Sequence, residues 1–99
     1  MYILIRDSVP AGLAVVAAAH ASLAAYLEFE GDPEVAEWLS PGPFRKVVCA
    51  VGDAEFEEAK GFADRVVLTE SALGGREVAV AFRPRREWPA RFRRYRLYG

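Results

Sequence analysis

The stretch Pro10–Tyr26, with the sequence PAGLAVVAAAHASLAAY, decides the fold of this chain. Eight of its seventeen residues are alanine, the strongest helix former, and proline suits the first turn of a helix. The larger apolar residues recur near helical spacing, whereas the alanines leave the remaining faces thin. We therefore predict a helix that packs very closely on a sheet. If Ala18 faces that sheet, Ala18→Leu should destabilise the chain by overpacking.

One imidazole interrupts this apolar surface. His20 lies seven residues after Leu13 and seven before Leu27, which places it on or beside the buried side of the helix. A lone histidine on an apolar helix is more often a packed core residue than a catalytic base. It could instead be the base that activates water, with Thr69, Glu70 or Asp7 orienting it, so both interpretations stay open.

Composition sets the limits on what the chain can be. It has 99 residues, 53% hydrophobic and 27% charged, which predicts one domain over residues 1–99 with a modest core. The apolar helix follows a strand-like segment and lacks a basic lead-in, so we expect neither a signal peptide nor a membrane span. The single cysteine, Cys49, lies in an apolar run and excludes a cysteine-based metal site. We expect a cytoplasmic protein without metal or cofactor.

The charges are unevenly distributed along the chain, although the formal net charge is only −1. Nine acidic residues lie between Glu28 and Glu58, where only two residues are basic. From Arg83 onward there are seven arginines and one acid, Glu87. These arginines either form a solvated face that balances the acidic one or, with the aromatic residues among them, hold phosphates and stack bases. Composition favours the solvated face.

The order of elements points to an α/β domain. We predict strands at Tyr2–Ile5, Phe44–Val51, Arg65–Thr69, Glu77–Phe82 and Arg94–Tyr98, and helices at Pro10–Tyr26, Pro33–Leu39, from Asp53 to about Ala63, and irregularly within Pro84–Phe92. The continuous apolar runs Ile3–Ile5, Val47–Val51 and Val78–Val80 should be adjacent central strands. In the last strand, Arg94 and Arg96 should share the face opposite Tyr95 and Leu97, which would face the core.

Several short motifs are similar to those of a known family. The chain opens with a strand that ends in Arg6 and Asp7, followed by a small-residue helix that carries His20 and Ala21. This opening resembles that of the type 2 peptidyl-tRNA hydrolases. The likeness continues through Lys46–Val48, Asp53–Ala63, Thr69–Ser71 and Val78–Phe82. It covers nearly the whole chain as a pattern of elements and small motifs.

The resemblance implies a four- to five-stranded mixed sheet with helices on both faces. It also implies a homodimer that acts on the ester between a peptide and the terminal ribose of tRNA. For an enzyme of this kind the catalytic residues would be His20, Asp7, Thr69 and Glu70. The tRNA backbone would be held by Arg6, Arg76, Arg94 and Arg96.

The departures from the family concern its catalytic centre. The family opens its long helix with Gly-Lys-Gly-Lys, followed by Ala-Ala-Gln, whereas this chain has Pro10–Leu13 and then Val15–Ala17. The lysines and the glutamine are missing, so we expect catalysis by the family's usual route to be weak or absent. Three functions therefore remain: hydrolysis of a tRNA-linked ester, RNA binding without chemistry, and protein interaction. Trp38 and Trp88 are interpreted as core or dimer anchors.

Overall fold

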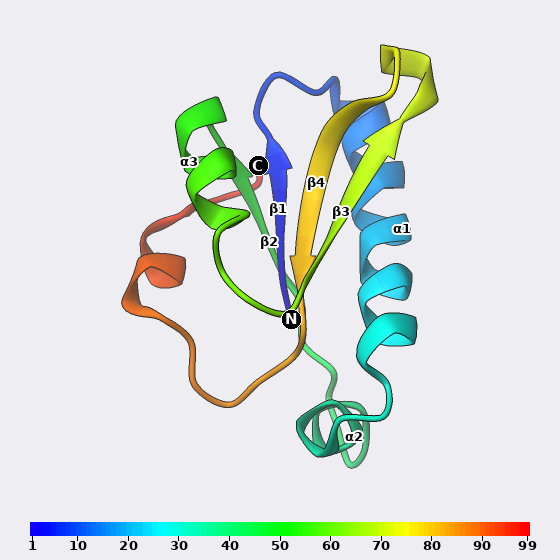
Figure 1. Cartoon of the computed structure of the whole chain (residues 1–99), viewed down its shortest axis with the longest axis vertical. Helices are drawn as coiled ribbons and strands as arrows, with labels where there is room; N and C mark the ends of the chain where they lie inside the picture. Colours follow the sequence, from blue (N-terminus) through cyan, green and yellow to red (C-terminus); the bar gives the residue numbers. More distant parts are fainter.

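The computed structural model describes residues 1–99 and forms an α/β domain with three helices and a five-stranded mixed sheet (Figure 1). The strands are β1 (Tyr2–Arg6), β2 (Val47–Val51), β3 (Arg65–Glu70), β4 (Arg76–Phe82) and β5 (Arg96–Leu97); the helices are α1 (Ala11–Phe29), α2 (Pro33–Leu39) and α3 (Asp53–Ala59). Short 3-10 turns occur at Ser71–Leu73 and Ala90–Arg94. The α/β class and the mixed sheet that we expected are confirmed.

The sheet has the strand order β3-β4-β1-β2-β5. β1 is parallel to β2 and antiparallel to β4, while β3 pairs antiparallel with β4 and β5 pairs antiparallel with β2. Leu4 lies between Cys49 on β2 and Val80 on β4, so the three most apolar strands are neighbours at the centre. This arrangement confirms the prediction made from their continuous apolar runs.

Helix α1 covers one face of the sheet, over β3, β4 and β1 (Figure 1). Its buried residues are Ala14, Ala17, Ala21 and Ala25, spaced three or four apart, and they belong to the same core cluster as Ile3 and Ile5 of β1. Because alanine has the shortest apolar side chain, the helix backbone can lie close to the strands. The helix ends at Phe29, directly before Glu30 and the turn at Gly31 and Asp32.

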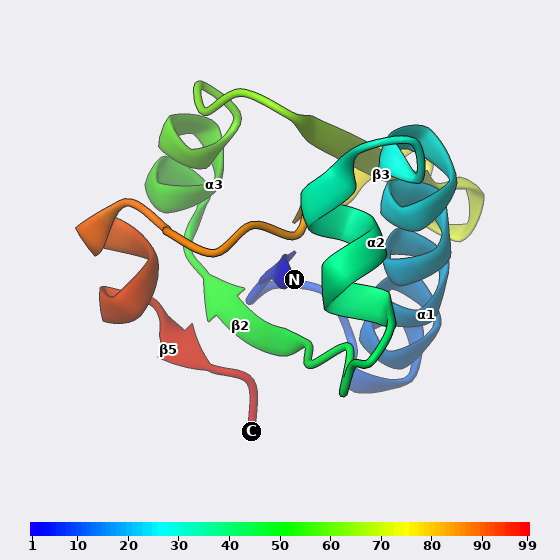
Figure 2. The ribbon, with the colours of Figure 1, turned by 90° about the horizontal axis from the view of Figure 1, so that it is seen from below.

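The opposite face of the sheet is covered by α3 and by the C-terminal segment, as the view from below shows (Figure 2). Phe92 is the centre of this second core. Its ring lies 4.9 Å from that of Phe82 and 5.2 Å from those of Tyr2 and Trp88, measured between centroids. Edge-on aromatic contacts of this kind add to the burial of apolar area. They fix the otherwise irregular residues after β4.

Three predicted boundaries are wrong. β2 begins at Val47 and not at Phe44, because Phe44 has a φ of 42°, outside the extended region. Helix α3 ends at Ala59, well before Ala63. The last strand contains only Arg96–Leu97, since Arg94 belongs to the preceding 3-10 turn.

The predicted orientation of the last strand is half correct. Tyr95 is 5% exposed, but Leu97 is 67% exposed, so Leu97 does not face the core. β5 is a two-residue strand at the edge of the sheet, and too little chain lies beside it to cover Leu97.

Candidate functional site

The predicted site residues at the start of the chain lie at the edge of the sheet where β1, β2 and β3 end. Arg6 closes β1, and its Nη1 donates a hydrogen bond of 2.6 Å to Oδ1 of Asp53. Its guanidinium also lies 4.3 Å from the ring centroid of Phe56, and the side chain is 14% exposed. Arg6 therefore joins β1 to α3, and these contacts leave little of its guanidinium free for a phosphate.

The predicted acidic residues at this edge do not converge. β4 lies between β1 and β3, and neighbouring strands are about 4.8 Å apart, so the strand ends that lead to Asp7 and Glu70 are about 10 Å apart. The Glu70 carboxylate accepts a hydrogen bond of 3.1 Å from the N–H of Ala72 and so caps the turn after β3. Thr69 is exposed on β3. Of the predicted set, Asp7 and Arg96 approach each other at 4.0 Å between Oδ2 and Nη2, and Glu70 and Arg76 are register partners on β3 and β4.

His20 lies on the exposed side of α1, so the prediction that it sits on or beside the buried side is wrong. The four buried alanines define the inner side, and His20 points well away from them. It is also nine residues after Ala11, which is about 14 Å along the helix axis. Since α1 begins at the edge that carries Asp7 and Glu70, His20 is far from both carboxylates (Figure 1).

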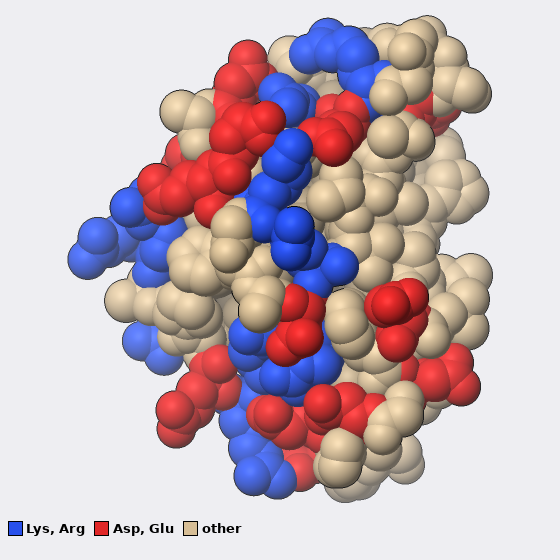
Figure 3. Space-filling view, in the orientation of Figure 1, with Lys and Arg blue, Asp and Glu red and all other residues tan.

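The basic C-terminal residues mostly form ion pairs with the acidic half of the chain. Seven of the thirteen Lys and Arg side chains are paired: Arg6, Lys60, Arg83, Arg85, Arg86, Arg91 and Arg96. Arg83 contacts Asp32, Glu34 and Asp64 at 3.2–3.4 Å. Positive and negative side chains consequently alternate on the face shown in Figure 3.

The same ion pairs shift the pKa values of their members. The backbone N–H of Arg86 and the guanidinium of Arg83 lower the pKa of Glu34. Burial, followed by repulsion from Arg83, lowers the pKa of Arg85. Two predicted RNA-binding residues, Arg76 at the start of β4 and Arg94 in the 3-10 turn after β4, form no ion pair and lie on different elements.

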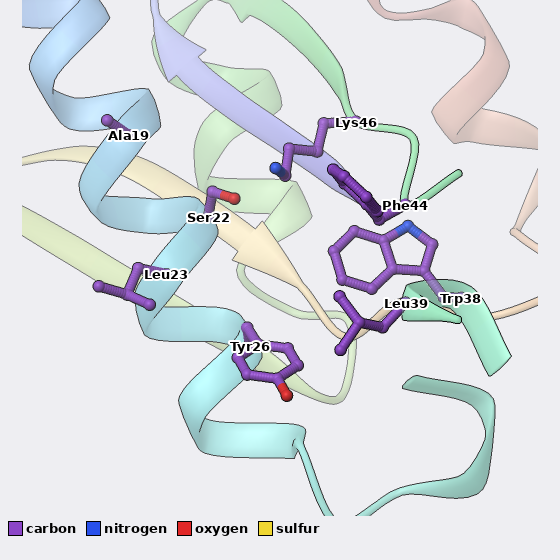
Figure 4. Close-up of a pocket in the computed structure, with 8 residues that line it drawn as sticks. All are labelled: Ala19, Ser22, Leu23, Tyr26, Trp38, Leu39, Phe44 and Lys46. Carbon is purple, nitrogen blue, oxygen red and sulfur yellow. The ribbon is translucent and has the colours of Figure 1, made fainter. Parts of the chain in front are cut away.

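An apolar pocket lies between α1, α2 and the residues that lead into β2, with a volume of about 340 Å³ (Figure 4). Its lining residues are Ala19, Ser22, Leu23, Tyr26, Trp38, Leu39, Phe44 and Lys46. Nε1 of Trp38 donates a hydrogen bond of 2.9 Å to the carbonyl of Arg45, which fixes the ring against the loop. The Lys46 ammonium lies 5.3 Å from the ring centroid of Phe44 at the rim.

A second apolar cavity, of about 260 Å³, lies on the same side of the sheet. It is lined by Ile5, Ala14, Val15, Ala18, Val48 and Tyr98. Helix α1 packs mainly over β3, β4 and β1, and this cavity lies beside it, where Val48 of β2 and Tyr98 complete the lining (Figure 2). The two cavities therefore flank the same side of one helix.

Between these cavities, α1 exposes an uncharged surface. No Asp, Glu, Lys or Arg occurs from Ala11 to Leu27, and Val15, Leu23 and Leu27 are 68%, 59% and 57% exposed. Figure 3 shows the matching uncharged area over the middle of α1. We call the exposed side chains of Ala11–Leu27, together with Leu39, Phe44 and Tyr98, the apolar face.

The sequence predicts only part of the apolar face. Trp38 was interpreted as a core or dimer anchor, and it does line the first pocket. Phe44 was assigned to a buried strand and is half exposed. The feature that could have predicted the apolar face is the absence of charged residues along a helix long enough to need a solvent-facing side.

The remaining chemistry of the chain is modest. Burial raises the pKa of the Cys49 thiol to about 11, which keeps it in the unreactive form. No group of three or more His, Cys, Asp or Glu side chains gathers as a metal site would require. By length and composition alone α1 could cross a bilayer, a property that core helices of soluble proteins share.

These features define an α/β domain with an uncharged apolar face, in which His20 lies apart from the edge that carries Asp7 and Glu70. Comparison of the sequence with protein-family models and with curated proteins gives no match.

Proposed function

We propose that this chain is a non-catalytic protein-interaction domain with the fold of the type 2 peptidyl-tRNA hydrolases, and that the apolar face is its working surface. Two features support the likeness to that family. The elements follow one another in the order that the resemblance implies, and a mixed sheet lies between helices. The turn at Arg6 and Asp7 leads into the small-residue helix, in the order that the resemblance implies.

The observation that carries the proposal is the uncharged, exposed side of α1. A helix that packs on a sheet ordinarily places charged residues on its outer side. Here the seventeen residues Ala11–Leu27 carry none, and Leu23 and Leu27 are more than half exposed. Exposed apolar surface of this extent, beside two apolar cavities, is typical of a site that another protein covers.

Hydrolysis of a tRNA-linked ester, the alternative, lacks geometric support. A general base must come within about 2.6–3.2 Å of the proton it removes, and donors must face the developing oxyanion. His20 is about 14 Å along α1 from the edge that holds Asp7 and Glu70. The lysines with which the family opens this helix are replaced by Pro10–Leu13. RNA binding without chemistry is weakened because Arg83, Arg86 and Arg91 are engaged by carboxylates.

Site-specific photo-crosslinking in the producing cell tests the proposal. A photoreactive phenylalanine analogue replaces Leu23 on the apolar face, and the control carries it in place of Arg93, which is exposed and unpaired on the 3-10 turn after β4. We expect protein adducts from position 23 and few from position 93. Equal yields from both positions, or none from position 23, would contradict the proposal.

A second assay addresses the alternative directly. Purified protein is incubated with tRNA that carries an N-blocked aminoacyl group, and release of that group is followed. We expect no release above the spontaneous rate. Turnover that is lost in His20→Ala or Glu70→Gln would replace the interaction proposal with an enzymatic one.

A further inference from the structure

The cavity of about 340 Å³ between α1, α2 and the residues that lead into β2 has a polar end and an apolar end. Lys46 and Ser22 point into it at one end, from different walls, and Tyr26 and Leu39 line the other end (Figure 4). Its volume lies within the range of about 300–1,000 Å³ that is typical of small-molecule sites. Such sites are lined mainly by apolar and aromatic side chains, with a few polar groups that orient the ligand. The lining of this cavity follows that pattern.

The aromatic wall of the cavity is held in place by the chain itself. Nε1 of Trp38 donates a hydrogen bond of 2.9 Å to the carbonyl of Arg45, and the backbone N–H of Phe44 donates one of 3.0 Å to the carbonyl of Trp38. The rings of Trp38 and Phe44 meet edge-on, with their centroids 6.3 Å apart. Because these rings are already ordered, a ligand that packs on them loses little affinity to the ordering of side chains.

The charge at the cavity is positive and has no partner within the chain. Lys46 is the only charged residue of the lining, and its ammonium forms no ion pair. The carboxylates of the neighbouring helix α2 are engaged elsewhere, because Glu34 contacts Arg83 and Glu37 contacts Arg86. Lys46 is therefore free to pair with a carboxylate from outside the chain.

From this arrangement we infer that the cavity binds a small carboxylic acid with an apolar body. The carboxylate lies beside the ammonium of Lys46 and accepts a hydrogen bond from the hydroxyl of Ser22. The apolar body packs on the rings of Tyr26 and Trp38. This site goes beyond the proposed function, because the ligand binds between α1 and α2 of one chain whether or not another protein covers the apolar face.

A phosphate and a neutral apolar molecule both fit the cavity less well than a carboxylate. Phosphate sites combine several donors, such as arginine forks and the backbone N–H groups at a helix N-terminus. Here one ammonium and one hydroxyl point into a cavity whose other six lining residues are hydrophobic. A neutral apolar molecule would leave the charge of Lys46 without a partner. A singly charged acid matches both ends of the cavity.

Titration of the isotope-labelled protein with 3-phenylpropionate, followed by NMR, tests the inference. The neutral 3-phenylpropionamide, which has nearly the same size and shape, is the matched ligand. The chain has two tryptophans and therefore two indole N–H signals. The signal of Trp38 should shift on binding, and that of Trp88, which packs against the core on the other face of the sheet, should not. We expect the acid to bind about two- to fivefold more tightly than the amide, which is the effect of an exposed ion pair.

Lys46→Ala and Arg45→Ala are matched variants for this titration. Each removes one exposed positive charge, at adjacent positions, but only Lys46 lines the cavity. Lys46→Ala should bind the acid and the amide equally, whereas Arg45→Ala should keep the preference for the acid. Equal binding of both ligands by the wild type, a preference that survives in Lys46→Ala, or no shift of the Trp38 signal with either ligand would overturn the inference.

A peptide that ends in phenylalanine distinguishes a free acid from the end of a protein chain, because its last residue contains the same phenylpropionate group. Acetyl-Gly-Gly-Phe with a free carboxylate should bind no more tightly than 3-phenylpropionate. Tighter binding of the peptide would overturn the small acid as ligand in favour of the end of a partner chain. Protein adducts from position 23 test the proposed function separately, so a failed titration leaves that proposal in place.

Discussion

Replacing Ala21 with leucine tests the close packing of α1 on the sheet. Ala21 is fully buried, in the core cluster that contains Ile3, Ile5 and Ala79. Leucine adds three carbon atoms where no free space exists, which costs about 1–3 kcal/mol. In a domain of this size, 1 kcal/mol shifts Tm by about 4–8 °C, so Ala21→Leu should lower it by about 5–20 °C.

Ala18→Leu is the matched control for this substitution. Ala18 is only partly buried, at the rim of the cavity of about 260 Å³ beside Val48 and Tyr98, where a larger side chain has room. Its free energy of unfolding should stay within about 0.5 kcal/mol of wild type. Urea titrations followed by circular dichroism measure both variants. A wild-type midpoint for Ala21→Leu, or a larger loss in Ala18→Leu, would refute the assignment of the inner side of α1.

Three further predictions follow from buried or paired groups. Cys49, whose pKa burial raises to about 11, should resist alkylation at pH 8 in the native protein and react in urea; rapid labelling without denaturant would contradict its burial. Arg86 and Arg83 lower the pKa of Glu34, so its stabilising contribution is present above its ordinary pKa of about 4.3 and is lost as the pH falls through the lower folded value. Glu34→Gln should therefore flatten the loss of stability in acid, which urea midpoints against pH would show. His20→Ala should change the free energy of unfolding by less than about 0.5 kcal/mol, since the side chain is exposed; a larger loss in a thermal melt would mean that it packs.

Much of the fold could be predicted because its signals are local. Continuous apolar runs such as Ile3–Ile5 and Val78–Val80 can be buried on both faces only as central strands. The alanine-rich stretch had to be a helix. Its inner side could not be predicted, because the helix is apolar nearly all round and periodicity then distinguishes no face. Close approach to the strands selected the alanines and turned His20 outward.

The site was harder to predict because its determinants are not local. Arg83 and Glu34 are 49 residues apart in the chain, and their ion pair exists only once α2 lies beside the end of β4. The arginines that cluster in the sequence therefore form ion pairs with carboxylates from distant parts of the chain. The carboxylates Asp7 and Glu70 were assigned to one catalytic site through the resemblance, but β4 lies between their strands. The exposure of the apolar face follows from the position of α1 over the sheet, and the periodicity of the sequence does not predict that position.

Sedimentation velocity of the wild-type chain beside Leu23→Glu tests most directly whether the apolar face is a protein-interaction surface, with a second copy as the partner that the family resemblance implies. Leu23 is 59% exposed, so Leu23→Glu should leave the fold intact while placing two like charges in the proposed interface. Arg93→Glu, on another surface, is the charge-changing control. We predict that the wild type and Arg93→Glu sediment as dimers and that Leu23→Glu sediments as a monomer. A wild type that stays monomeric over the whole accessible concentration range, or a Leu23→Glu variant that remains dimeric, would contradict that prediction.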